Sequence, residues 1–163
     1  RRFALGTRIY EIIRELDHYK KTGDATGKSS ALRIELWRHA WIKIRQSPFW
    51  GYGTGDLTNE LTDAYIHSKT PLHPAYWYHP HNQYLSTALA TGIPSVFILL
   101  FLILNPLILK NRNRHPLFML SLLIILLSML DEDTLTTQAG ATQVAFLYVF
   151  TYLSPAIKKL HEP

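Results

Sequence analysis

The chain has 163 residues, a length that suits one domain, and a formal net charge of +5. Its basic residues form no stripe with interleaved aromatic side chains, so we expect no nucleic acid among its partners. The absence of cysteine excludes disulfides, thiol chemistry and thiolate metal sites. The chain opens on Arg1, Arg2 and Phe3 without a Met or an apolar leader, and we expect it to be the C-terminal part of a longer protein.

The polar first half of the chain predicts two amphipathic helices. Apolar side chains recur at helical spacing over residues 3–19, and Gly23 follows as a stop signal. The second helix is predicted to begin at Ser29 or Ser30, either of which can act as N-cap, and to run to about Gln46.

Pro48 ends this second helix, and the composition changes after it. Residues 48–78 are rich in Gly, Pro, Thr and aromatic residues, which is typical of an ordered functional loop. Glycine stands at every second position from Gly51 to Gly55, just before Asp56. Nucleotide-binding glycine motifs follow a strand, whereas a helix and a proline come first here. We therefore exclude such a motif and expect a tight turn that presents Asp56 to a substrate.

Three apolar stretches follow, at residues 93–109, 116–130 and 141–157. Each is near the lower limit of roughly 17–25 residues for a membrane-spanning helix. Buried core helices are the alternative, but three such stretches with almost no interior charge are hard to fit into a soluble domain of this size. The predicted fold is an all-α, multi-pass helical integral membrane protein, with a large, mainly helical periplasmic loop (1–91) and C-terminal membrane helices (92–163).

The charges of the short connections predict an orientation. Residues 110–115 and 158–159 carry positive charges, whereas residues 131–133 are all acidic. Because short basic loops stay in the cytoplasm, we expect residues 1–91 and 131–133 on the opposite side of the membrane, outside the cytoplasm.

Arg33 and Trp37 are a first candidate pair, because residues four apart share one face of a helix. An arginine near a helix start can hold a phosphate or carboxylate through two parallel hydrogen bonds. A solvated arginine beside a packed tryptophan is the simpler alternative, and the spacing alone leaves both open.

His79 and His81 stand where the polar half meets the first apolar stretch. An imidazole exchanges protons near neutral pH and can act as a general base towards a substrate hydroxyl. The alternative is that both are interfacial polar residues. A metal site formed with His73 and Asp56 is disfavoured, because no Cys or Glu completes a ligand set, and we expect neither a metal nor another cofactor.

Glu132 lies on the same predicted side as the histidines, where it can orient a substrate or a histidine, or simply be solvated. Tyr76, Trp77 and Tyr78 precede the histidines and can stack on sugar rings or form part of an interfacial aromatic belt.

Together these motifs resemble the C-terminal part of the bacterial O-antigen ligase and O-antigen polymerase family. The resemblance is carried, in chain order, by Arg33-x3-Trp37-x2-Ala40, Pro48-x2-Gly51-x-Gly53-x-Gly55, His81-Asn82-x-Tyr84-Leu85 before Gly92, and the segment from Glu132 to Gly140. It implies an inner-membrane glycosyltransferase that contacts membrane lipids and needs no metal. Such an enzyme transfers glycan from undecaprenyl diphosphate to lipid A-core or another acceptor sugar at the periplasmic face.

The resemblance also implies roles for individual residues. Arg33 is expected to engage the lipid diphosphate, and His81 to assist the attack of the acceptor hydroxyl. Substrate contacts are expected from Arg33, His79, Asn82, Trp37, Asp56, Tyr84 and Glu132.

Other functions fit the same motifs. An O-antigen polymerase or a protein O-oligosaccharyltransferase differs in its acceptor, which these residues do not report. A non-catalytic membrane carrier or glycan-binding module is a further alternative, and in such a protein His81 and Arg33 would be replaceable.

Overall fold

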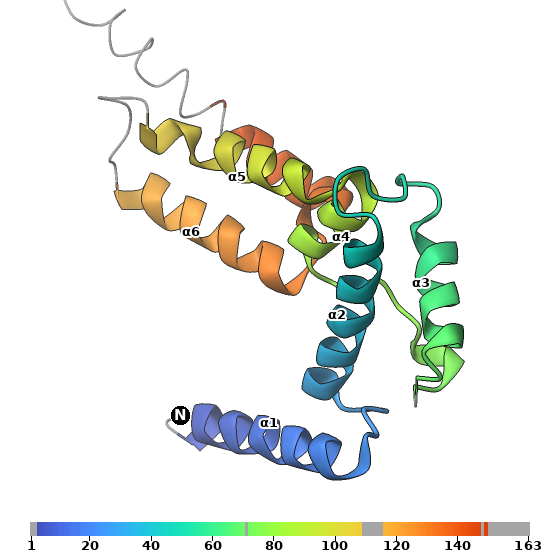
Figure 1. Ribbon diagram of the computed structural model, residues 1–163. Helices are drawn as coiled ribbons and strands as arrows, with labels where there is room; N and C mark the ends of the chain where they lie inside the picture. The colour runs from blue at the N-terminus through green and yellow to red at the C-terminus, as the bar shows by residue number, and fades with distance from the viewer. Residues whose placement is uncertain (1–2, 71, 109–115, 148, 150–163) are drawn as a thin grey trace, which may run out of the picture.

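A computed structural model describes residues 3–70, 72–108, 116–147 and 149, which form helices and connecting loops without strands (Figure 1). The elements are α1 (Phe3–Thr22), α2 (Ser29–Gln46), α3 (Leu57–His67), the short 3-10 helix η1 (Pro74–Tyr76), α4 (Gln83–Thr91), α5 (Ile93–Ile108), α6 (Pro116–Asp131) and the 3-10 helix η2 (Thr134–Thr136). Residues 138–147 are also helical. The all-α part of the predicted fold class agrees with this architecture, and α1 and α2 lie where the two amphipathic helices are predicted.

Helix α2 is the centre of the main core, with α3 and α4 packed against it. Leu36 and Ile44 of α2, Leu61 and Tyr65 of α3, and Leu89 of α4 are each at most 3% exposed. Burial of an aliphatic or aromatic side chain contributes roughly 1.5–3 kcal/mol. This core therefore holds α3 and α4 against α2.

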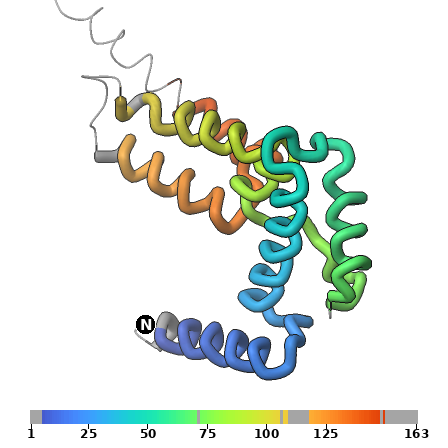
Figure 2. Tube along the Cα trace, viewed as in Figure 1, coloured from blue at the N-terminus to red at the C-terminus, as the bar shows by residue number. Residues whose placement is uncertain are grey.

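Helix α1 is attached to this core near its C-terminal end. Figures 1 and 2 show α1 projecting from the base of α2, with the N-terminus at its far end. The Tyr19 hydroxyl donates to the Glu35 carboxylate, and the Ser30 N–H donates to the Glu15 carboxylate at 3.2 Å. Earlier along the helix the apolar side chain of Ile13 is exposed.

The glycine-rich segment after α2 packs against the end of α4. The N–H groups of Tyr52 and Gly53 donate to the carbonyls of Leu89 and Ala90, each at 2.8 Å. These bonds satisfy carbonyls that the last turn of a helix leaves without partners. Gly51 has a φ of +66°, and a Cβ there would lie 2.5 Å from the Leu89 oxygen. Part of the glycine pattern thus serves close backbone packing.

Gly92 separates α4 from α5. Its φ is +88°, and a Cβ would overlap the Phe49 carbonyl. The Ile93 N–H, which opens α5, donates to the Pro48 carbonyl at 2.7 Å. Gly92 therefore ends α4, and α5 begins as a separate helix.

Helices α5 and α6 share a second core, formed by Ile103, Phe118, Leu122, Ile125 and Met129. Each helix has 16 residues, about 24 Å at 1.5 Å per residue, which is shorter than the roughly 30 Å apolar layer of a bilayer. Over the described residues, none of the helices has both the length and the apolar sequence to cross a membrane, so the prediction of membrane-spanning helices is wrong there. The last part of the third predicted stretch, residues 150–157, lies outside the described residues.

The segment predicted as a loop, residues 48–78, contains α3 and η1. Leu61, Ala64 and Tyr65 place their side chains on one buried face of α3. This additional helix supports the residues that lead to His81.

Candidate functional site

Arg33 and His81 lie where the first half of α2, the start of α4 and the end of α6 come together. Arg33 is in the second turn of α2, and its Nη1 lies 2.7 Å from Oδ1 of Asp131, the last residue of α6. His81 precedes α4, and its Nδ1 lies 3.7 Å from Oε2 of Glu132. The Arg33 and His81 side chains are 37% and 45% exposed, so a ligand can reach both. Two groups distant in sequence thus meet consecutive carboxylates.

Asp131 was missed in the sequence, although its acidic segment was recognised. A carboxylate at a helix C-terminus meets the negative end of the helix dipole, which is unfavourable. The Arg33 guanidinium offsets that cost by pairing with Asp131. The sequence signal for the Arg33–Asp131 pair is therefore an aspartate at the C-terminal end of a predicted helix, where a negative charge is unfavourable unless a cation is near.

The acidic segment is fastened to α4 by side chains. The Ser86 hydroxyl donates to Oδ1 of Asp133 at 2.6 Å, and the Leu135 N–H donates to Oε1 of Gln83 at 2.7 Å. Neither Ser86 nor Gln83 was singled out in the sequence. These bonds hold Glu132 beside the start of α4.

His81 adopts a left-handed conformation with a φ of +47°. The next residue, Asn82, is 5% exposed and caps α4 by accepting a hydrogen bond from the Leu85 N–H at 3.1 Å. Its amide nitrogen also donates to the Leu130 carbonyl at the end of α6. Asn82 therefore joins α4 to α6, and its expected substrate contact stays a prediction.

Trp37 and His79 lie on either side of this segment. The Trp37 indole N–H donates to the Pro80 carbonyl at 2.7 Å, so its polar group is already used within the protein. His79 Nε2 lies 3.2 Å from the Thr58 hydroxyl in the first turn of α3. A substrate contact by either residue stays a prediction.

Tyr84 and Asp56 differ in their surroundings. The Tyr84 hydroxyl donates to the Leu126 carbonyl of α6, and burial raises the Tyr84 pKa. Asp56 is exposed at the start of α3, and no hydrogen bond or ion pair among the described residues joins it to Arg33 or His81. The structure thus brings Tyr84 near the α4–α6 contact but gives Asp56 no link to the site.

The disfavoured metal site has no counterpart among the residues that the structure describes. They contain no group of three or more His, Asp or Glu side chains arranged to hold a metal ion. His79 is instead close to Thr58, and His81 to Glu132.

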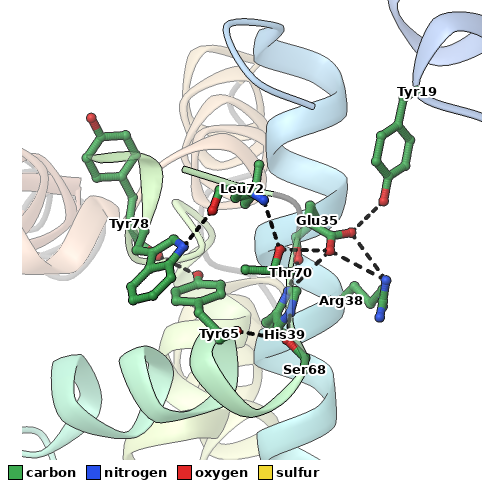
Figure 3. Close-up of polar contacts among 10 residues, drawn as sticks. Tyr19, Glu35, Arg38, His39, Tyr65, Ser68, Thr70, Leu72 and Tyr78 are labelled. Atoms are coloured by element: carbon green, nitrogen blue, oxygen red, sulfur yellow. Dashed lines mark hydrogen bonds and ion pairs between the residues drawn. The ribbon is translucent and has the colours of Figure 1, made fainter. Parts of the chain in front are cut away.

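Helix α2 also carries a buried polar cluster that was not predicted from the sequence (Figure 3). Glu35 and His39 are completely buried one turn apart. The Glu35 carboxylate accepts hydrogen bonds from Arg38 and Thr70, whereas His39 Nε2 lies 2.6 Å from the Ser68 hydroxyl. Because these buried polar groups have partners, the cluster can fix α2 against the end of α3. Two polar residues four apart within an apolar helix face were the available signal.

The exposed groups can perform a defined kind of chemistry. A guanidinium binds and neutralises an anion, and an imidazole beside a carboxylate can accept a proton while its orientation is held. The combination of Arg33, His81 and Glu132 therefore suits displacement of an anionic leaving group by a hydroxyl.

Comparisons with known proteins support a specific relationship. The family model described as O-antigen ligase matches residues 2–100. A Haemophilus influenzae protein described as "Uncharacterized protein" is 30% identical over 92 residues, which is 55% of this chain and 23% of that relative. The chain thus spans about a quarter of the relative's length. No solved structure matches this chain. Because the family model covers more than half of the chain, the chain belongs to the O-antigen ligase family.

Proposed function

We propose that this chain carries donor- and acceptor-handling residues of a glycosyltransferase of the O-antigen ligase type. The enzyme would transfer glycan from undecaprenyl diphosphate to a lipid A-core sugar at the periplasmic face of a bacterial inner membrane. The observation that carries the proposal is the convergence of Arg33 and His81 beside Asp131 and Glu132. Membership of the O-antigen ligase family supports glycan chemistry of this general kind.

The proposed reaction forms one glycosidic bond and breaks one glycosyl–phosphate bond. The acceptor oxygen bonds to the anomeric carbon of the donor, and undecaprenyl diphosphate leaves with the bonding electron pair. Arg33 neutralises the charge that develops on the diphosphate, and His81 accepts the proton of the acceptor hydroxyl. Glu132 lies on the Nδ1 side of His81, which leaves Nε2 for the acceptor.

Asp131 has a further consequence in this mechanism. The Asp131 carboxylate holds the guanidinium that the donor needs. An incoming diphosphate therefore displaces Asp131 from Arg33 or shares Arg33 with it. Exposed ion pairs of this kind contribute only about 0–1 kcal/mol, so a diphosphate can compete with it.

The first test is complementation by the intact protein in a host whose own ligase gene is deleted. We expect Arg33→Ala and His81→Ala each to reduce long-chain lipopolysaccharide at least 100-fold, because each removes a group used in the transition state. Arg45→Ala and His67→Ala replace an exposed arginine and an exposed histidine away from the site and should retain the product. Normal product from His81→Ala or Arg33→Ala, at a normal protein level, would leave that residue without a catalytic role. Failure of the unsubstituted protein, at a normal level, to restore the product would favour a non-catalytic glycan-binding module.

The proposed location has its own test. Thr54 is exposed, and the chain contains no cysteine. In intact cells, Thr54→Cys should react with a small maleimide that cannot cross the inner membrane, with the unsubstituted protein as background. Reaction only after the inner membrane is permeabilised would place this segment in the cytoplasm.

A further inference from the structure

The segment that leads to α4 is held by two side chains through its backbone. The Tyr65 hydroxyl donates to the Tyr78 carbonyl at 2.8 Å, and the Trp37 indole N–H donates to the Pro80 carbonyl at 2.7 Å. Pro80 immediately precedes His81, and Tyr78 lies three positions before it. Tyr65 belongs to α3 and Trp37 to α2, so both packed helices restrain this segment.

Tyr65 is a rigid anchor for such a restraint. Its side chain is 1% exposed, and its ring stacks on Trp77 with centroids 5.6 Å apart. On another side it contacts the buried His39 ring at 4.8 Å. Burial raises the Tyr65 pKa, so the hydroxyl keeps the proton that it donates. Figure 3 shows Tyr65 between the His39 cluster and the Tyr78 segment.

His81 needs this restraint because of its backbone conformation. A residue with a Cβ is disfavoured at a φ of +47°, and such a conformation persists only where the surrounding structure enforces it. The Tyr78 ring stands edge-on to the His81 ring, with centroids 6.2 Å apart. The carbonyl that Tyr65 holds and the ring beside His81 therefore belong to the same residue.

We propose that Tyr65 is a positioning residue that, through Tyr78, holds His81 in its left-handed conformation beside Glu132. Tyr65 itself touches no substrate, because its ring is buried and its hydroxyl is bonded to the backbone. This inference rests on the proposed function, in which His81 accepts the proton of the acceptor. In this proposal, α3 positions the His81 imidazole for proton transfer through Tyr65.

The test compares two tyrosine hydroxyls in the intact protein. Tyr65→Phe removes only the bond to Tyr78. Tyr52→Phe removes a similar bond to the Lys43 carbonyl of α2, together with a longer one to the Gln46 side chain. Both variants should show a similar, small fall in melting temperature. Only Tyr65→Phe should lower kcat, by about tenfold or more, because misplacement of a reacting group by about 1 Å can slow a reaction 100-fold. Its KM for an undecaprenyl diphosphate-linked glycan should not change, since Arg33 is untouched. Equal kcat values in the two variants would overturn the proposal.

Hydrogen–deuterium exchange of the peptide 79–86 distinguishes this failure from failure of the proposed function. Asn82 caps α4 through the Leu85 N–H, so displacement of this segment exposes that amide. Faster exchange is expected in Tyr65→Phe and not in Tyr52→Phe, whether or not the protein transfers glycan. Unchanged exchange in Tyr65→Phe would refute positioning by Tyr65. Faster exchange together with a fully active His81→Ala variant would uphold the restraint on His81 and refute its catalytic role.

Discussion

Replacement of Gly92 by alanine is expected to cost about 3–5 kcal/mol of unfolding free energy. Two effects add at this position. The φ of +88° is disfavoured for any residue with a Cβ, and the new methyl group would overlap the Phe49 carbonyl. Backbone atoms cannot move aside as a flexible side chain can, so the contact between the Pro48 segment and the start of α5 must open. Denaturant unfolding of the intact protein, followed by tryptophan fluorescence, measures this loss.

Gly53→Ala is the matched control for Gly92→Ala. Gly53 has a similar φ of +83°, but a Cβ there meets nothing within 4 Å. We expect this variant to lose only the conformational part, about 1–2 kcal/mol. Equal losses at Gly53 and Gly92 would contradict the close contact with Phe49.

The second large effect is expected at His81, where two substitutions should lower glycan transfer alike but differ in stability. His81→Gly removes the imidazole and relieves the left-handed strain, whereas His81→Ala removes the imidazole and keeps the strain. We expect glycan transfer to fall at least 100-fold in both variants. The Gly variant should be more stable than the Ala variant by about 1 kcal/mol. Glycine is normally the less stable of the two within regular structure, so the order itself is informative.

Transfer assays and thermal unfolding of the same two His81 preparations check this prediction. Gln83 provides a comparison at the first residue of α4, where the backbone is helical and Gln83→Gly should be less stable than Gln83→Ala. If His81→Ala were the more stable variant, the left-handed conformation would be refuted. If His81→Gly still transferred glycan at the normal rate, proton transfer by His81 would be refuted.

The helices that are amphipathic by simple periodicity were predictable from the sequence. The start of α2 at Ser29 follows from the local pattern, although Lys28 rather than a serine occupies the N-cap position. Helix α3 was not predicted, because the neighbouring glycines and prolines dominated the composition. Its spacing of Leu61 and Tyr65 carried the missed signal. The break at Gly92 involves close packing against the Phe49 carbonyl, more than 40 positions earlier in the chain. A contact between such distant residues cannot be predicted from the local sequence pattern.

The candidate site was only partly predictable for a similar reason. Arg33 and His81 could be proposed from residue type and motif context, but their roles stay predictions. Their carboxylate neighbours, Asp131 and Glu132, approach only after α6 packs against α4. Asn82 looked like a substrate contact because it is polar, whereas in the structure both ends of its amide are bonded to the backbone.

The apolar stretches show how composition alone can mislead. Leu, Ile and Phe dominate both α5 and α6, and such sequences suit either a bilayer or a helix–helix core. Gly92 ends α4 before α5 begins, and α5 and α6 bury Ile103 against Phe118 and Leu122. The helices of the described residues do not combine the length and the apolar sequence that a membrane-spanning helix needs. Composition alone does not give the helix length.

Under the proposed function, Arg33 and His81 act together in one transfer step. The most direct measurement is the rate of glycan transfer from an undecaprenyl diphosphate-linked donor by the intact protein, its Arg33→Ala and His81→Ala variants and the double variant. Groups that act as a unit are non-additive, so the double variant should be about as slow as the slower single variant. A normal rate for either single variant, or losses that multiply in full in the double variant, would contradict a shared site.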